Sequence, residues 1–420
     1  MSDECIVTII KTGTMHVNLI SLLFTTSEST NQPCTKLLGR ESFIKCLRKH
    51  STQNIDQIGS TLPGISSKAQ KIVGWWLAGC SGMVFGAVIL GGVTRLTESG
   101  LSMVDWHLFK ERPPLNQKEW EKEFMKYQQF PEFKVKNKDM TLEEFKRIWY
   151  MEYTHRMWGR AIGAFFAIPA TIFWMKGWLT PVMKPRILAF GALIGLQGLL
   201  GWYMVKSGLN VNKEAVEAAD YVPRVSQYRL ASHLGTAFVL YTLFSWSALT
   251  HLLPPQKIEY SKALRRFRIF AHSTKGLIFL TAISGAFVAG LDAGLYYNSF
   301  PKMGEKWIPN ELLNFSPTWK NFFENPITVQ FDHRYLGKAV FCSVTGLWLL
   351  SRRLKLSPRA HLATNVLFTL GICQVGLGIA TLLTYVPTWL AASHQSGSLI
   401  LLTTALWLTH ELRLVKYVPK

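Results

Sequence analysis

Eight long stretches of the chain are almost entirely apolar, and polar links separate them. They cover residues 72–93, 157–177, 186–206, 230–252, 267–291, 334–351, 361–385 and 388–410. Each is about 20 residues long, the length of helix that crosses about 30 Å of hydrocarbon. A helix in a large soluble core shows an apolar stripe, whereas these stretches are apolar on all sides. The pattern predicts an all-α membrane protein with eight transmembrane helices.

The basic residues are placed in alternate links. The net charge is +20, and the links after the second, fourth and sixth stretches are rich in Lys and Arg. The long link 94–154 holds equal numbers of acidic and basic residues. This alternation is the positive-inside pattern of membrane proteins, so the charge does not indicate a nucleic-acid partner. It predicts that both termini lie on the inner side, which is the matrix if the organelle is a mitochondrion.

The first 70 residues differ in composition from the rest. Residues 34–51 hold five basic residues against one acidic residue, and such acid-poor basic leaders suit mitochondrial import. We predict a targeting leader or a disordered N-terminus over residues 1–70. The six cysteines form no CxxC or CxxCH motif, so neither a zinc knuckle nor a covalent c-type haem is indicated.

Three motifs occur twice in the same order, which indicates an internal repeat. The first copy contains His155-Arg-Met-Trp-Gly-Arg160, Gln197-Gly-Leu-Leu-Gly201 and Ala231-Ser-His233, and the second contains His333-Arg-Tyr-Leu-Gly-Lys338, Gln374-Val-Gly-Leu-Gly378 and Ala392-Ser-His394. A weaker echo relates Gly86-Ala87 to Gly285-Ala286. Four helices per copy is an even number, so both copies enter the membrane in the same sense. We therefore expect two parallel-repeated four-helix bundles, over residues 71–252 and 253–420.

Two polar links are long enough to carry structure of their own, and both belong on the outer side. In the link 94–154, the spacing of charged and apolar residues predicts short amphipathic helices over 115–127 and 141–150. The link 291–332 carries Trp307 and Trp319. We expect these two tryptophans to anchor the outer membrane interface.

Four of the eleven histidines lie in the repeated motifs: His155, His233, His333 and His394. The predicted topology places all four at the outer ends of even-numbered helices. Two histidines at similar depth on facing helices can hold a haem between them. Each unit would supply one pair, His155 with His233 and His333 with His394. A zinc or di-iron site is disfavoured, because the one Glu-x-x-His motif, Glu152 to His155, has Gln330 at the equivalent place.

Charged residues near the histidines distinguish the two units. Glu152 precedes His155 by three residues and lies on nearly the same helix face, where Arg156 could pair with it. Arg95 and Glu98 also belong to the first unit, and the weak echo gives them no charged counterparts. This asymmetry indicates one reactive site and one electron-relay site. Arg156 and Arg334, with Arg160 and Lys338 one turn further on, could meet haem propionates or be interfacial side chains.

From about residue 68 onwards the chain resembles the haem A synthase family, and its mitochondrial branch in particular. The stretches that carry the resemblance are Gly86–Ser102, Glu152–Arg160, Gln330–Arg334 and Ala392–Gly397. The resemblance implies that His333 and His394 hold a haem b (protohaem IX) cofactor and that haem O, the substrate, binds near His155 and His233. It further implies that Glu152 is needed for activity.

The reaction that the resemblance implies is stepwise oxidation of a methyl group of haem O, through an alcohol and a hydrate, to the formyl group of haem A for cytochrome c oxidase assembly. A ferredoxin-type redox partner is expected. Haem O synthase, oxidase assembly factors and a second copy of the chain are further plausible partners. Some bacterial members carry a cysteine pair in the first outer loop, and this chain has none in 94–154.

Three other functions remain open from the residues alone. A transmembrane electron carrier needs haems near both faces, whereas the four motif histidines fall on one. A haem chaperone would need the histidine pairs but not Glu152. A transporter would be expected to have broken helices near mid-membrane.

Overall fold

The computed structural model describes residues 65–107, 111–209, 223–256, 258–259, 261–413 and 415–416. The predicted leader lies outside these residues except for positions 65–70. There the first helix, α4, already begins at Ser67, and the Ser66 side chain caps it by accepting from the Ala69 N–H at 3.2 Å.

Eight long helices form the body of the described chain, and each contains one of the predicted apolar stretches or nearly all of it. They are α4 (Ser67–Leu96), α7 (Leu142–Met175), α8 (Met183–Leu209), α10 (Gln227–Leu252), α11 (Lys262–Gly290), α13 (Pro326–Ser351), α14 (Pro358–Leu383) and α15 (Thr388–Glu411). The short elements are α5 (Gln117–Tyr127), α6 (Pro131–Val135), η1 (Ala293–Leu295), η2 (Thr318–Lys320), α12 (Asn321–Glu324) and a parallel pair of two-residue strands, β1 (Ile258–Glu259) with β2 (Val415–Lys416).

The second amphipathic helix predicted in the outer link is not separate. Helix α7 runs unbroken for 34 residues from Leu142, so the predicted helix 141–150 is its first part. It starts at a capping box, in which Thr141 and Glu144 each bond the other's backbone N–H. The pattern changes from amphipathic to apolar near residue 157, but no Gly or Pro lies between 142 and 157 to end the helix. The other predicted amphipathic helix is confirmed as α5.

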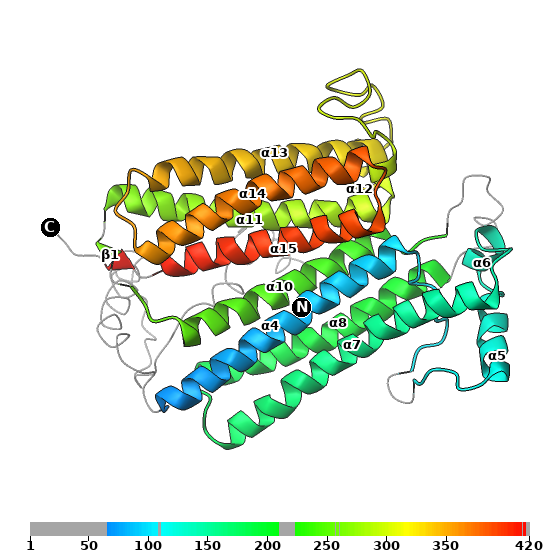
Figure 1. The fold of residues 1–420 in the computed structure, drawn as a ribbon, viewed down its shortest axis with the longest axis horizontal. Helices are drawn as coiled ribbons and strands as arrows, with labels where there is room; N and C mark the ends of the chain where they lie inside the picture. Colours follow the sequence, from blue (N-terminus) through cyan, green and yellow to red (C-terminus); the bar gives the residue numbers. More distant parts are fainter. Residues whose placement is uncertain are drawn as a thin grey trace, which may run out of the picture.

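The long helices pack as two closed rings. In the first, α4 packs on α7, α7 on α8, α8 on α10, and α10 returns to α4. In the second, α11, α13, α14 and α15 do the same. The rings meet where α10 contacts α11 and α15, and where α15 contacts α4. In Figure 1 the second ring lies above the first.

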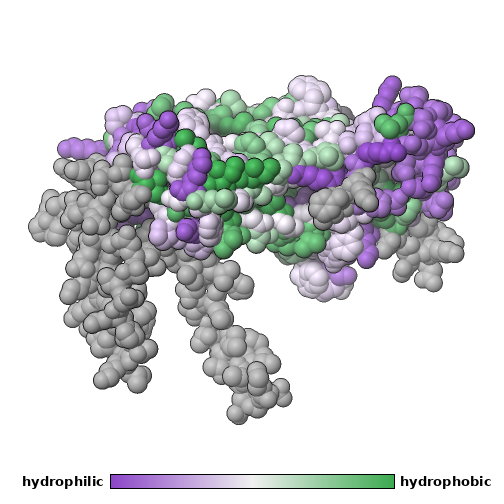
Figure 2. All heavy atoms as spheres, turned by 90° about the horizontal axis from the view of Figure 1, so that it is seen from below, coloured by the Kyte–Doolittle hydropathy of each residue, from purple (hydrophilic) through white to green (hydrophobic). Residues whose placement is uncertain are grey.

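Five of the long helices, α4, α7, α8, α11 and α14, are long and apolar enough to cross a membrane. Figure 2 shows hydrophobic side chains gathered along the middle of the molecule, with hydrophilic ones towards both ends. Helices α10, α13 and α15 fall outside the five, and of these α10 and α15 lie where the rings meet. Helix α15 has eleven buried residues, whereas the peripheral helix α8 has four. Because protein surrounds α10 and α15, their sequences need less apolar surface for lipid.

Both long outer links lie at one end of the bundle, and the basic links lie at the other (Figure 1). The link 94–154 has a small core of its own, made by Met103, Trp120, Tyr127, Phe145 and Trp149. This core holds the link against the start of α7. Trp307 and Trp319 in the other long link are exposed, as expected of interfacial anchors.

Candidate haem-binding site

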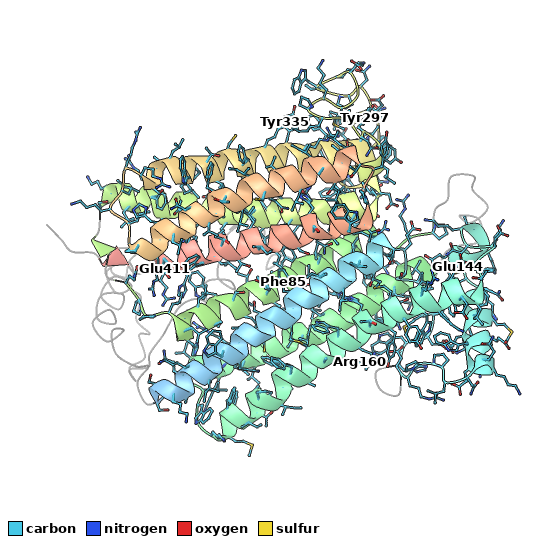
Figure 3. The ribbon with its side chains drawn as sticks, viewed as in Figure 1. Phe85, Glu144, Arg160, Tyr297, Tyr335 and Glu411 are labelled. Atoms are coloured by element: carbon cyan, nitrogen blue, oxygen red, sulfur yellow. The ribbon has the colours of Figure 1, made fainter. Side chains whose placement is uncertain are left out.

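The four motif histidines lie near the point where the apolar stretch of each helix begins. This is the end of the bundle that carries the long outer links. His233, His333 and His394 are about two turns inside α10, α13 and α15, and His155 lies deeper in α7 because that helix starts early. Figure 3 shows Arg160 and Tyr335, which are close to two of these histidines in sequence, on the side of the outer links, and Glu411 at the opposite end.

Each histidine ring packs against a glycine on the preceding long helix. The distance from a Cβ added to the glycine to Cε1 of the histidine measures how close they are. It is 2.9 Å for Gly91 and His155, 3.4 Å for Gly201 and His233, 3.2 Å for Gly285 and His333, and 2.8 Å for Gly378 and His394. The four contacts are equivalent in the two rings. Small residues here let an imidazole fit between two close helices.

The second histidine of each pair is held by the repeated glutamine. Gln374 Nε2 donates to the carbonyl oxygen of His394 at 2.8 Å and lies 3.2 Å from its Nδ1. Gln197, with its amide oriented to satisfy its neighbours, contacts His233 O at 3.2 Å and Nδ1 at 3.1 Å in the same way. The sequence showed these glutamines as a repeated motif without indicating what they contact.

The first histidine of each pair is held differently. His333 Nδ1 lies 2.7 Å from Ser284 Oγ, whereas the buried Nδ1 of His155 has no partner among the described residues. Ser284 belongs to no repeated motif, so this contact could not be predicted from the sequence.

The His333–His394 pair has the dimensions of a bis-histidine haem site. The ring centres are 6.3 Å apart and the ring planes are nearly perpendicular, at 86°. Two metal–nitrogen bonds of about 2 Å, with about 1.1 Å from each nitrogen to its ring centre, give nearly the same separation. Ser284 Oγ can accept the His333 Nδ1 proton, which leaves Nε2 of that ring for a metal. The Gln374 amide nitrogen can only donate, so it positions the His394 ring without fixing a proton on Nδ1.

Glu152 is buried, and its carboxylate is fully engaged. Oε2 accepts from Ser102 Oγ and from the Met103 N–H, both at 2.8 Å, and Oε1 accepts from Arg156 Nη2 at 2.7 Å. Glu152 therefore ties the outer link to α7, one turn from His155. The pair with Arg156 forms, but Glu152 is only 2% exposed, so this is not a surface salt bridge.

Arg156 and Arg334 both fasten outer links over the histidine pairs. Arg156 donates to the carbonyls of Asp105 at 2.9 Å and Met103 at 2.8 Å. Arg334 donates to the carbonyls of Tyr297 at 2.7 Å and Ser299 at 2.9 Å, and to Gln330 Oε1 at 3.0 Å. Arg334 Nε is buried with no partner among the described residues, so this N–H is available to a ligand.

The cations one turn further on contact the same links. Arg160 donates to the carbonyl of His107 at 2.6 Å and pairs with Glu111, which also pairs with Arg156. Lys338 lies 5.8 Å from the ring centre of Trp307 in the link 291–332, and 4.2 Å from that of Tyr335 on its own helix.

The weak echo between Gly86 and Gly285 was in the wrong register. The histidine contacts show that Gly91 is the equivalent of Gly285. Helices α4 and α11 end at residues 96 and 290, and each is followed by a residue with left-handed backbone, Glu98 (φ 54°) or Asp292 (φ 52°). In all three comparisons the equivalent positions of the two units are 194 residues apart. Glu98 therefore has a charged counterpart, contrary to the sequence prediction. Arg95 has none, and it crosses to the second unit to pair with Asp292 at 2.8 Å.

Comparison with known proteins shows the family of the chain. Residues 74–406 match the model of the family COX15-CtaA, described as cytochrome oxidase assembly protein. The chain belongs to this family. The match to COX15-CtaA includes all four motif histidines and Glu152. The chain is 63% identical over 357 residues to "Heme A synthase COX15" of Bos taurus, covering 85% of this chain and 86% of that one. It is 41% identical over 419 residues to the protein of the same name from Arabidopsis thaliana (94% and 91% covered) and 45% identical over 358 residues to "Heme A synthase" of Nitrosospira multiformis (84% and 98% covered).

Proposed function

We propose that this protein is a haem A synthase, which oxidises a methyl group of haem O to the formyl group of haem A for cytochrome c oxidase assembly. The observation that carries the proposal is the doubled histidine site, in which two pairs occupy equivalent places in two helical rings. Membership of the COX15-CtaA family, with relatives named haem A synthases along most of the chain, supports it.

The eight long helices are proposed to cross the mitochondrial inner membrane as two parallel-repeated four-helix units, with both termini in the matrix. The two closed rings, the hydrophobic middle of the molecule and the basic links gathered at one end support this orientation. The four histidines then lie towards the outer side.

The C-terminal unit, 253–420, is proposed to hold haem b through His333 and His394. The ring separation fits a single metal between them, and the free Arg334 N–H is suited to a propionate. When bound there, haem b supplies one-electron transfer, and a ferredoxin-type protein is the proposed redox partner. The chain itself fixes both imidazoles through Ser284 and Gln374 and covers the site with the link 291–332.

The N-terminal unit, 71–252, is proposed to take the substrate haem O between His155 and His233. Arg156 and Arg160 hold the link 94–107 over this site and keep water from it. Glu152 is the proposed proton-handling group. It would hold or release a proton at Oε2, to which the Ser102 hydroxyl donates at 2.8 Å.

Product analysis with Glu152→Gln tests the proposal. Purified protein is given haem O, oxygen and a ferredoxin reducing system, and extracted haems are identified by mass. The wild type should form hydroxylated haem O and haem A, and the variant should bind haem O but turn over at least about 100-fold more slowly. The second unit already combines Gln330 with Arg334, so a glutamine beside this arginine is compatible with the fold.

Glu143→Gln is the matched control, because Glu143 is exposed near the start of the same helix. An equal rate in Glu152→Gln and wild type would favour a haem chaperone in which the carboxylate has no chemical role. Protohaem alone, with no oxidised haem O from the wild type, would favour an electron carrier.

A further inference from the structure

We propose that Ser284 and Leu90, which occupy equivalent positions in the two units, decide how firmly the first histidine of each pair holds iron. Ser284 makes His333 a permanent ligand of the cofactor. Leu90 leaves His155 as a ligand that can be released from the substrate. This inference rests on the proposed assignment of both histidine pairs to haem.

The contact in the second unit fixes the proton of His333. Ser284 Oγ donates its own hydrogen to the carbonyl of Thr281, at 2.7 Å. It must therefore accept from His333 Nδ1, which lies 2.7 Å away. The ring proton is then on Nδ1, and Nε2 keeps the lone pair that a metal takes. Such a bond also fixes the plane of the ring and makes it a stronger ligand.

The first unit lacks this contact at the same place. The constant difference of 194 residues that relates Gly91 to Gly285 also relates Leu90 to Ser284, each being the residue before the glycine that faces the histidine. A leucine side chain can accept no hydrogen bond. His155 Nδ1 is accordingly buried without a partner among the described residues. Its ring packs against Gly91 without a hydrogen bond at Nδ1 from the described residues.

The second histidine of each pair is contacted in the same way in both units. Gln197 and Gln374 contact His233 and His394 alike, through the same ring nitrogen and the same backbone carbonyl. The two sites therefore share one anchored ligand and differ in the other. A missing second contact of this kind typically weakens a metal ligand by about 10- to 100-fold.

This asymmetry matches what each site must do. A cofactor has to stay bound with both ligands in place. A substrate haem has to enter and leave, and an iron held by two histidines has no open position. A weakly oriented His155 lets the substrate site open while the cofactor site stays closed.

Carbon monoxide and haem retention measure the ligand strength without using turnover. In Ser284→Ala, protohaem retained through purification should fall about 10-fold or more, and the reduced protein should bind carbon monoxide where the wild type does not. Ser284→Thr keeps the hydroxyl and should behave as the wild type. Conversely, Leu90→Ser loaded with haem O should bind carbon monoxide about 10-fold more weakly than wild type, whereas Leu90→Ala should not.

The inference would be overturned if a well-folded Ser284→Ala variant retained as much haem as the wild type and bound no carbon monoxide. It would also be overturned if Leu90→Ser bound carbon monoxide as tightly as the wild type. Failure of the underlying assignment looks different: His333→Ala would then keep its full protohaem content, whatever the Ser284 and Leu90 variants do.

Discussion

At the scale of single residues, the site depends on what lies against each imidazole. The repeated motifs made the histidines and glutamines predictable, because residue identity recurs at similar spacing. The facing glycines could not be assigned in the first unit, because Gly91 lies five residues from the glycine that the echo paired with Gly285. Ser284 was not predictable, because its hydroxyl matters only through a partner 49 residues away.

The glycine behind His394 should be required for its position. A Cβ at residue 378 would lie 2.8 Å from the ring, so Gly378→Ala should push the imidazole away and lower protohaem retention by about tenfold. Gly376→Ala is the control, because nothing lies within 4 Å of a Cβ there. Equal haem content in both variants, measured per mole of purified protein, would contradict this role.

Glu132 in the outer link should make that link sensitive to pH. Burial raises the pKa of its carboxyl to about 8, with Glu152 and Glu98 adding repulsion, although the Tyr127 hydroxyl donates to it at 2.9 Å. The folded link favours the protonated acid. The stability that Glu132 contributes to the folded link is therefore fully present below the ordinary pKa of about 4.5 and is lost as the pH rises to about 8.

We expect the folded link to lose about 1.4 kcal/mol per pH unit between pH 5 and 8, seen as faster proteolysis of residues 94–154 at the higher pH. Glu132→Gln should remove this dependence, and Glu121→Gln, at an exposed position, should keep it. A wild-type cleavage rate that does not change with pH would show that Glu132 does not control the link.

At the scale of elements, apolar length located every long helix, but not where each begins. Helix α7 starts 15 residues before its apolar stretch, because a capping box and continuous helix-forming sequence extend it into the outer link. Hydrophobicity marks the part of a helix in lipid, whereas caps mark its ends. The ion pairs that fasten helix ends were also not predictable, since they join distant segments.

The inner end of α15 provides an example. Buried Glu411 accepts from Arg359 Nε and pairs with its Nη2, both at 3.1 Å, while Arg359 also donates to the carbonyl of Pro254 at 2.6 Å. Arg359→Ala should leave a buried carboxylate poorly compensated and cost about 2 to 3 kcal/mol. The thermal midpoint in detergent should fall by several degrees, and that of the exposed control Arg353→Ala should not. Equal midpoints would mean that Glu411 is neutral or paired elsewhere.

At the scale of the whole molecule, the two units are joined close to their sites. Gln395, next to His394, reaches into the first unit and donates to the carbonyl of Val88 on α4 at 3.0 Å. Its amide fills the space where a Cβ of Gly92 would be, beside the Gly91 that faces His155. The repeated motifs predicted two units but not this contact between them. The residue equivalent to Gln395 in the first unit is Leu234, so the contact has no counterpart in the repeat.

Adding a methyl group at this junction should separate α4 from α15. Gly92→Ala should cost about 1 to 3 kcal/mol, because Gln395 must give up its bond to Val88. Gly82→Ala, on the same helix with nothing within 4 Å of its Cβ, should have little effect. A thermal midpoint in Gly92→Ala equal to that of Gly82→Ala would show that the junction tolerates the change.

Two histidine pairs are proposed to hold two different haems, and haem extraction is the decisive test. Haems from purified wild type, His333→Ala and His155→Ala would be identified by mass beside optical spectra. We expect protohaem with haem O or its oxidised derivatives in the wild type. His333→Ala should lose protohaem, and His155→Ala should lose the haem O derivatives but keep protohaem. Full protohaem in His333→Ala, or no haem in well-folded wild type, would contradict this proposal.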